Sequence, residues 1–159
     1  MLADIVVDTN VFLHAENRQE PRREQAEGLL LALQNQTCTT LLCVDEGFDV
    51  NEANNRSHIG SEYLRHLRFG TLAYAVVVHL LGSQRTKQVP RGVPRNVSRR
   101  ISQQGVVGAD RTFIKVAYNS QDKTLACHDF DDVPEAVRAR LRGSIGVRIL
   151  AADGALAIL

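Results

Sequence analysis

Short apolar runs alternate with amphipathic stretches along the chain. Residues 5–7 form a β-branched run that ends at Asp8, which is typical of a buried parallel strand with a polar residue at its carboxyl end. Comparable runs predict three further strands, at residues 39–44, 123–127 and 147–150. Because strands that alternate with helices form parallel sheets, the pattern predicts an α/β fold, a three-layer sandwich with a central parallel sheet.

Apolar positions three and four residues apart predict the helices between these strands. The clearest helix begins near Pro21 and carries Ala26, Leu29 and Leu33 on one face. The other expected helices cover residues 46–54, 61–81, 109–119 and 133–141, and a shorter one lies near Asn96. No repeat or low-complexity tract interrupts the pattern, so residues 1–159 are expected to form one domain.

Composition restricts the classes of protein to which the chain can belong. Its 159 residues are 44% hydrophobic and 23% charged, which is enough to bury a core and excludes a disordered chain. The apolar run at 76–81 is preceded by Arg65, His66 and Arg68, so no transmembrane helix is expected. The first residues lack the basic region of a signal peptide, and the three cysteines form no CxxC motif. We therefore expect a cytoplasmic protein.

Positive charge is concentrated in one segment. The net charge of +1 indicates no particular partner, but residues 83–100 contain two prolines and no acidic residue. We name this segment the basic arm and expect a loop or loosely structured arm that contacts RNA phosphates. A solvated loop without a ligand is the alternative. The basic residues of the arm are Arg85, Lys87, Arg91, Arg95, Arg99 and Arg100.

Acidic residues fall at the ends of predicted elements. Asp8 ends the first strand and Asp129 follows the strand at 123–127, so both are expected at the edge where parallel strands have their carboxyl ends. Asp110 begins a predicted helix, and Glu52 lies on or near the helix after the second strand. Four carboxylates that converge repel one another unless a cation neutralises them. Oxygen ligands favour Mg²⁺ or Mn²⁺, and one or two such ions would suit hydrolysis of a phosphodiester.

Two stretches of the sequence resemble the PIN-domain ribonucleases, over about residues 5–150. They are IVVDTNVFLHA, which contains Asp8, and GADRTFIKVAYNSQDKTLACHDFDDV, which contains Asp110 and Asp129. The resemblance implies that these three residues are the family's first, third and fourth metal-binding acids. For the second acid we favour Glu52, with Glu46 and Asp49 as alternatives, and Asp131 and Asp132 are alternatives to Asp129 as the fourth acid. Thr9 and Asn10 are expected to support Asp8 or a metal-bound water, and Cys127 stands where the family usually has Thr or Ser.

The resemblance implies a metal-dependent endoribonuclease that acts on single-stranded RNA. Many members of the family are toxins of toxin–antitoxin pairs, so an antitoxin protein and a second copy of the chain are candidate partners besides RNA. The alternative is a catalytically inactive PIN-like module that binds RNA or a protein partner. A phosphatase with an aspartyl nucleophile is disfavoured, because Asn10 stands where that chemistry requires a second Asp.

Overall fold

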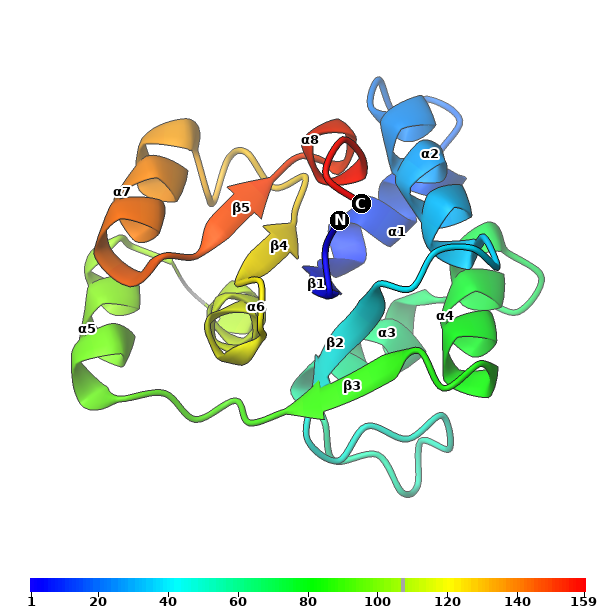
Figure 1. The fold of residues 1–159 in the computed structure, drawn as a ribbon, viewed down its shortest axis with the longest axis horizontal. Helices are drawn as coiled ribbons and strands as arrows, with labels where there is room; N and C mark the ends of the chain where they lie inside the picture. Colours follow the sequence, from blue (N-terminus) through cyan, green and yellow to red (C-terminus); the bar gives the residue numbers. More distant parts are fainter. Residues whose placement is uncertain (107) are drawn as a thin grey trace.

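Five parallel strands form the centre of the molecule, in the order β3-β2-β1-β4-β5 (Figure 1). The computed structural model describes residues 1–106 and 108–159. Every pair of neighbouring strands is parallel, and Val6 and Val7 of β1 pair with Leu125 and Ala126 of β4. The strands are β1 (Asp4–Val7), β2 (Leu41–Asp45), β3 (Thr86–Val89), β4 (Thr124–Ala126) and β5 (Arg148–Leu150). The expected α/β fold with a central parallel sheet is confirmed.

Helices cover the sheet in two groups. In one group α2 contacts α1, α4 and α8, and in the other α6 packs on β1, β2 and β4 and contacts α3 and α5. Helix α7 contacts α5 and β5, on the side of β5 in Figure 1. The helices are α1 (Thr9–Glu16), α2 (Arg23–Gln34), α3 (His58–His66), α4 (Leu72–Gly82), α5 (Arg95–Gln103), α6 (Gly108–Asn119), α7 (Glu135–Ile145) and α8 (Ala152–Leu156). This arrangement is consistent with the expected three-layer sandwich.

The core consists of apolar strand residues and an aromatic cluster above them. All four residues of β1 are buried, as expected for a parallel strand covered on both faces. The Tyr63 ring lies 5.1 Å from that of Phe12 and 6.5 Å from that of Phe113, measured between ring centroids. The Tyr63 hydroxyl donates to the carbonyl oxygen of Val7 at 2.5 Å, which satisfies a polar group that would be costly to bury alone. This bond ties α3 to the end of β1.

The order in which the chain adds strands to the sheet reverses at β1. The chain places β2 and β3 on one side of β1 and then returns to place β4 and β5 on the other side. In open α/β sheets, ligands bind outside the carboxyl ends of the strands at such a switch point. The fold therefore directs attention to Asp8, which follows β1, and to the segment after β4.

Two of the expected helices are wrong. Residues 46–57 form turns rather than a helix, and Gly47 has a φ of +85°, where a Cβ would come within 2.9 Å of the Cβ of Arg56. The expected helix at 61–81 is two helices, α3 and α4, separated at 67–71. Gly70 also has a φ of +85°, and Thr71 caps α4 by accepting a hydrogen bond from the backbone N–H of Tyr74.

The expectation of a loosely structured basic arm is also wrong. Residues Thr86–Val89 form the edge strand β3, which pairs with β2 from Leu42 to Asp45. The remainder of the arm leads into α5, as expected for the short helix near Asn96. The hydrophobic pattern did not predict strand β3, because three of its four residues are polar, and an edge strand tolerates polar residues.

Among the described residues, no helix combines the length and apolar character needed to span a bilayer.

Candidate functional site

Asp8 lies at the point where β1 passes into α1. Its backbone N–H still donates to the carbonyl oxygen of Ala126 on β4, while its side chain caps α1 by accepting from the N–H of Asn10 at 3.4 Å. The carboxylate is buried and also accepts a hydrogen bond from the Cys127 thiol at 3.1 Å. Burial raises the pKa of Asp8, and the hydrogen bond from Cys127 opposes that rise. Asp8 is thus held at the switch point, as the sequence predicts.

The two residues after Asp8 have different surroundings. Asn10 joins α1 to the segment after β4, because its side-chain oxygen accepts from the N–H of His128 at 3.0 Å. The Thr9 hydroxyl is buried and has no hydrogen-bond partner within the described part of the chain. An unpaired buried hydroxyl is costly, so Thr9 is available for the expected hydrogen bond to a metal-bound water.

The segment after β4 carries three further carboxylates, those of Asp129, Asp131 and Asp132. Asp129 accepts a hydrogen bond from the backbone N–H of Asp132 at 2.9 Å, so the segment turns back on itself between these residues. The buried guanidinium of Arg138 on α7 donates to the carbonyl oxygens of Cys127, Asp129 and Val133, at 3.2, 2.8 and 2.7 Å. One buried side chain therefore satisfies three backbone oxygens and fixes the shape of the segment.

The guanidinium groups of two arginines pack against the ring of Phe130 in the same segment. The guanidinium of Arg138 lies 4.1 Å from the centre of the Phe130 ring, and the guanidinium of Arg22 lies 4.1 Å from the same centre. His128 is also buried, with its Nε2 accepting from the N–H of Ala152 at 3.0 Å and its Nδ1 lying 3.0 Å from that of His14. Burial lowers the pKa of His128 to about 4, so this ring is neutral at pH 7.

Several negatively charged side chains act on the carboxyl group of Asp110. Asp110 lies in the first turn of α6, where the helix dipole favours an acidic side chain. Nevertheless its pKa is raised to about 6, first by burial and then by the negative charges of Asp8, Asp129, Asp132 and Glu62. Five carboxylates from four separate segments thus share one region of negative potential. We name these five residues the acidic cluster.

The acidic cluster fits a divalent cation. Carboxylate oxygens of Asp110, Asp129 and Asp132 all lie within 4.8 Å of one another, which one small ion can bridge. These hard oxygen donors suit Mg²⁺ or Mn²⁺ better than a softer metal. Binding of a cation would relieve the repulsion that raises the pKa of Asp110. The sequence left Asp132 only as an alternative to Asp129, because three acids follow His128 within four residues and spacing alone does not separate them. The structure brings both Asp129 and Asp132 close to Asp110.

Glu52, the favoured second acid, is not part of the acidic cluster. It lies exposed in the turns at 46–57, and the helix that was expected to carry it is absent. Its alternatives Glu46 and Asp49 are in the same turns. Glu62 on α3, in contrast to Glu52, acts on Asp110 through its charge and lines a hollow together with Gly108 and Ala109 of α6. In this structure its carboxylate also pairs with Arg65 at 3.3 Å and His66 at 3.6 Å.

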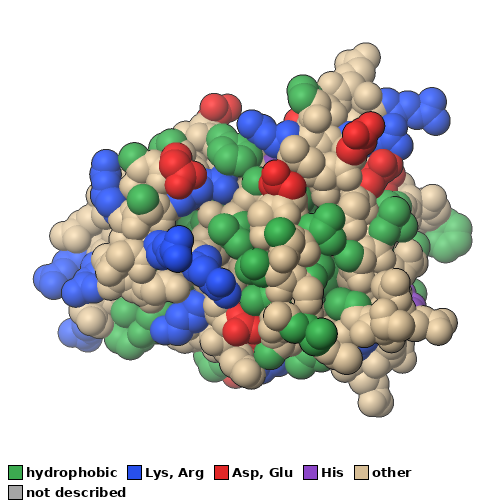
Figure 2. All heavy atoms as spheres, turned by 45° about the horizontal axis from the view of Figure 1, so that its top comes forward, with side chains coloured by type: hydrophobic (Ala, Val, Ile, Leu, Met, Phe, Trp, Pro, Cys, Tyr) green, Lys and Arg blue, Asp and Glu red, His purple; other side chains and the backbone are tan. Residues whose placement is uncertain are grey.

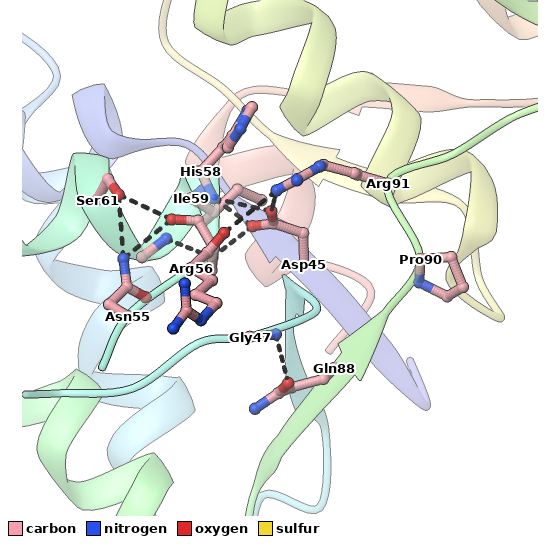
Figure 3. Close-up of polar contacts among 12 residues, drawn as sticks. Asp45, Gly47, Asn55, Arg56, His58, Ile59, Ser61, Gln88, Pro90 and Arg91 are labelled. Carbon is pink, nitrogen blue, oxygen red and sulfur yellow. Dashed lines mark hydrogen bonds and ion pairs between the residues drawn. The ribbon is translucent and has the colours of Figure 1, made fainter. Parts of the chain in front are cut away.

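Helix α3 is held in place by a buried carboxylate at the end of β2 (Figure 3). Asp45 accepts hydrogen bonds from the Ser57 hydroxyl at 2.5 Å and from the backbone N–H groups of His58 and Ile59 at 2.8 and 2.9 Å. Arg91, which reaches over from the end of β3, adds an ion pair of 3.1 Å to the same carboxylate. Asp45 thus binds the first turn of α3 to the sheet and determines where Glu62 lies one turn later.

The Asp45→Asn variant is expected to be less stable at neutral pH by about 2 kcal/mol, because hydrogen bonds to a charged acceptor are lost. Burial alone would raise the pKa of Asp45, but its hydrogen bonds outweigh that effect and lower the pKa below 3.8. As the pH falls below about 3.8, the unfolded state takes up this proton first, so the contribution of the carboxylate is lost. Urea unfolding of the wild type and of Asp45→Asn from pH 7 to pH 3 measures this effect. The difference between their free energies of unfolding should become smaller only at the acid end of this range. A constant difference would contradict this account.

The structure separates the basic arm into two parts. Arg85 donates to the carbonyl oxygens of Leu33, Asn35 and Thr40, and Lys87 pairs with the buried Asp4 at 2.9 Å. With Arg91 bound to Asp45, all three residues have partners within the protein and support the fold. Their assignment to RNA binding stays a prediction. The other three lie on α5, where Arg95, Arg99 and Arg100 are exposed to solvent.

Comparison with known proteins adds no relationship. No family model matches the chain, and no curated protein and no solved structure matches it. The resemblance to PIN-domain ribonucleases therefore stays a prediction that rests on the two sequence stretches.

Proposed function

We propose that the protein is a metal-dependent endoribonuclease that hydrolyses phosphodiester bonds of single-stranded RNA. The observation that carries the proposal is the group formed by Asp110, Asp129 and Asp132, whose carboxylate oxygens approach within 4.8 Å at the carboxyl edge of a parallel sheet. Asp8 adds a buried fourth carboxylate between β1 and β4. Such a concentration of negative charge is unfavourable for folding and is typical of a site that binds divalent cations.

The residues of the acidic cluster have separate roles in this proposal. Asp110, Asp129 and Asp132 would hold one or two Mg²⁺ or Mn²⁺ ions, and Glu62 would join them from α3. A bound ion would supply the positive charge that activates a water molecule and stabilises the phosphate as its charge grows. Asp8 would orient the site through its contacts with Asn10 and Cys127. The part of toxin in a toxin–antitoxin pair, with an antitoxin or a second copy as partner, stays a prediction from the resemblance.

Cleavage of a labelled single-stranded RNA tests the proposal. We expect cleavage in Mn²⁺ and none in excess EDTA. RNA that binds in EDTA but stays intact with every divalent cation would contradict the proposal and favour the inactive binding module instead. Because a metal that binds only the folded state also stabilises it, Mn²⁺ should raise the Tm of the protein as well.

Glu62→Gln and Glu52→Gln form a matched pair that tests the placement of the second acid. Both substitutions remove one negative charge from a glutamate, but only Glu62 acts on Asp110. We expect Glu62→Gln to lower the rate of Mn²⁺-dependent cleavage at least about tenfold, as for residues that support a metal site. Glu52→Gln should stay within about twofold of the wild type, because exposed substitutions have small effects. The reverse order of effects would restore Glu52 as the second acid.

A further inference from the structure

Helices α5 and α7 form a surface that is rich in arginine and poor in acid. The only acidic residue in the two helices is Glu135, at the start of α7. Figure 2 shows blue Lys and Arg side chains gathered over the end of the molecule where α5 and α7 lie in Figure 1. The arginines of the two helices are Arg95, Arg99, Arg100, Arg138, Arg140 and Arg142. We name the surface of these two helices the arginine face.

Side-chain hydrogen bonds fix the two helices to each other. Arg100 on α5 donates to the carbonyl oxygen of Ser144 on α7, and Arg140 on α7 donates to the side-chain oxygen of Gln104 just after α5 at 3.2 Å. These bonds run in both directions between the helices, which also pack directly together. The arginine face is therefore a preformed surface with fixed positions for its charges.

The positive charges of the arginine face are not neutralised by the protein. Arg95, Arg99, Arg140 and Arg142 are exposed. None of the ion pairs found among residues 1–106 and 108–159 involves an arginine of α5 or α7. Arg95 and Arg99 are four residues apart, so they project from the same side of α5. A surface with several uncompensated cations attracts polyanions and raises the rate at which they bind.

The arginine face adjoins the acidic cluster at two places. Helix α5 ends at Gln103, seven residues before Asp110, and α7 begins at Glu135, three residues after Asp132. Helix α5 also packs against α6, which carries Asp110, and nine residues of α5 span about 13 Å. The two helices are therefore neighbours of the elements that carry the carboxylates.

We propose that the arginine face binds the phosphate backbone of single-stranded RNA through Arg95, Arg99 and Arg140. The inference rests on the proposed function, because the acidic cluster identifies the polyanion as the substrate of a nuclease. It assigns binding to α5 and α7 in place of the β3 portion of the basic arm, whose cations support the fold. Because arginine contacts to phosphate carry no base information, the binding should depend on salt and little on sequence.

The experiment measures binding of a fluorescent single-stranded oligouridine by anisotropy, in EDTA, from 50 to 200 mM salt. The variants are Arg95→Gln with Arg99→Gln, and Arg99→Gln with Arg140→Gln. Each phosphate contact contributes about 0.7 to the slope of log affinity against log salt, so each double variant should lose about 1.4 from the slope. The control is Arg18→Gln with Arg68→Gln, which removes the same charge at two exposed positions outside α5 and α7 and should retain the wild-type slope.

The outcomes separate this inference from the proposed function. If both double variants keep the slope of the wild type, or if the wild type does not bind the oligouridine at 50 mM salt, the arginine face is not the binding surface. Hydrolysis of bis(p-nitrophenyl) phosphate with Mn²⁺ tests the acidic cluster independently, because this small phosphodiester does not need the helices. All three double variants should hydrolyse it at the wild-type rate. Loss of hydrolysis in the two face variants alone would show that they disturb the site and would overturn the inference.

Discussion

Replacement of Asp110 by Asn is expected to lower Mn²⁺-dependent RNA cleavage by at least about a hundredfold without unfolding the protein. Substitution of a group that only supports a metal ligand costs ten- to a hundredfold, so the loss of a ligand should cost at least as much. The fold should persist because burial, and then the negative charges of four neighbouring carboxylates, already disfavour the charged form of Asp110 and raise its pKa to about 6. A neutral amide removes that repulsion, so the Tm in EDTA should stay the same or rise.

Asp131→Asn provides the control for Asp110→Asn. Asp131 is exposed and lies between Phe130 and Asp132, yet it is not among the acids that approach one another around Asp110. Its variant should cleave RNA at the rate of the wild type and should retain the increase in Tm that Mn²⁺ causes. Asp110→Asn should lose that increase. Full activity of Asp110→Asn would show that the acidic cluster is not the catalytic site, whatever the fold.

Replacement of Arg138 by Met is expected to cause the largest loss of stability, about 4 kcal/mol. The guanidinium is buried, with 4% of its surface exposed, and it donates to the carbonyl oxygens of Cys127, Asp129 and Val133. Methionine has a similar volume but donates nothing, so three carbonyl oxygens would be left without these bonds. Each unsatisfied buried acceptor costs about 1–3 kcal/mol. Three such oxygens together cost about 4 kcal/mol when water replaces part of the lost hydrogen bonds.

Urea unfolding of Arg138→Met and Arg142→Met measures this effect. Arg142 lies one turn further along α7 and is exposed, so its replacement by Met should change the free energy of unfolding by no more than about 0.5 kcal/mol. The free energy of unfolding of Arg138→Lys should lie between those of Arg138→Met and Arg142→Met, because lysine keeps the charge but cannot reach all three carbonyl oxygens at once. Equal stability of the Arg138→Met and Arg142→Met variants would mean that the guanidinium contributes nothing to the segment that carries Asp129.

The sequence predicts the part of the acidic cluster that follows from strand order. Asp8 and Asp129 come after strands that the pattern identifies, and parallel strands place their carboxyl ends at one edge. Asp110 was predictable because an acid in the first turn of a helix follows directly from the helix boundary. These three positions depend on local patterns and one rule of topology.

Glu62 could not be placed by the same reasoning. The distance from β2 to α3 depends on the turns at 46–57, which are shaped by contacts of Gly47 and Asn55 rather than by a periodic pattern. One signal was present, since Ser57 is a favourable N-cap and caps α3 through the N–H of Gly60. A helix that begins there places Glu62 in its second turn. The link from Asp45 to α3 has no signal in the sequence, because it joins residues more than ten positions apart.

Strand β3 was hidden for a physical reason that also explains its composition. A strand in the middle of a sheet is buried on both faces and reads as apolar, whereas β3 has one neighbour and contains Thr86, Lys87 and Gln88. Its pairing with β2 depends on backbone hydrogen bonds, which no side-chain pattern reports. The bases of the arm were therefore attributed to a ligand, although Lys87 and Arg91 bind carboxylates of the protein itself.

The polar character of β3 has a consequence for how copies of the protein behave at high concentration. The outer edge of β3 offers unpaired backbone groups, and an apolar edge of this kind would recruit the edge of another molecule and start aggregation. A charged lysine on a short edge strand makes such an addition unfavourable, because the ammonium group would have to lose water against a second sheet. Lys87, whose side chain is 37% exposed, thus disfavours amyloid-like association through the edge of the sheet. Its ion pair with Asp4 stabilises the fold at the same time.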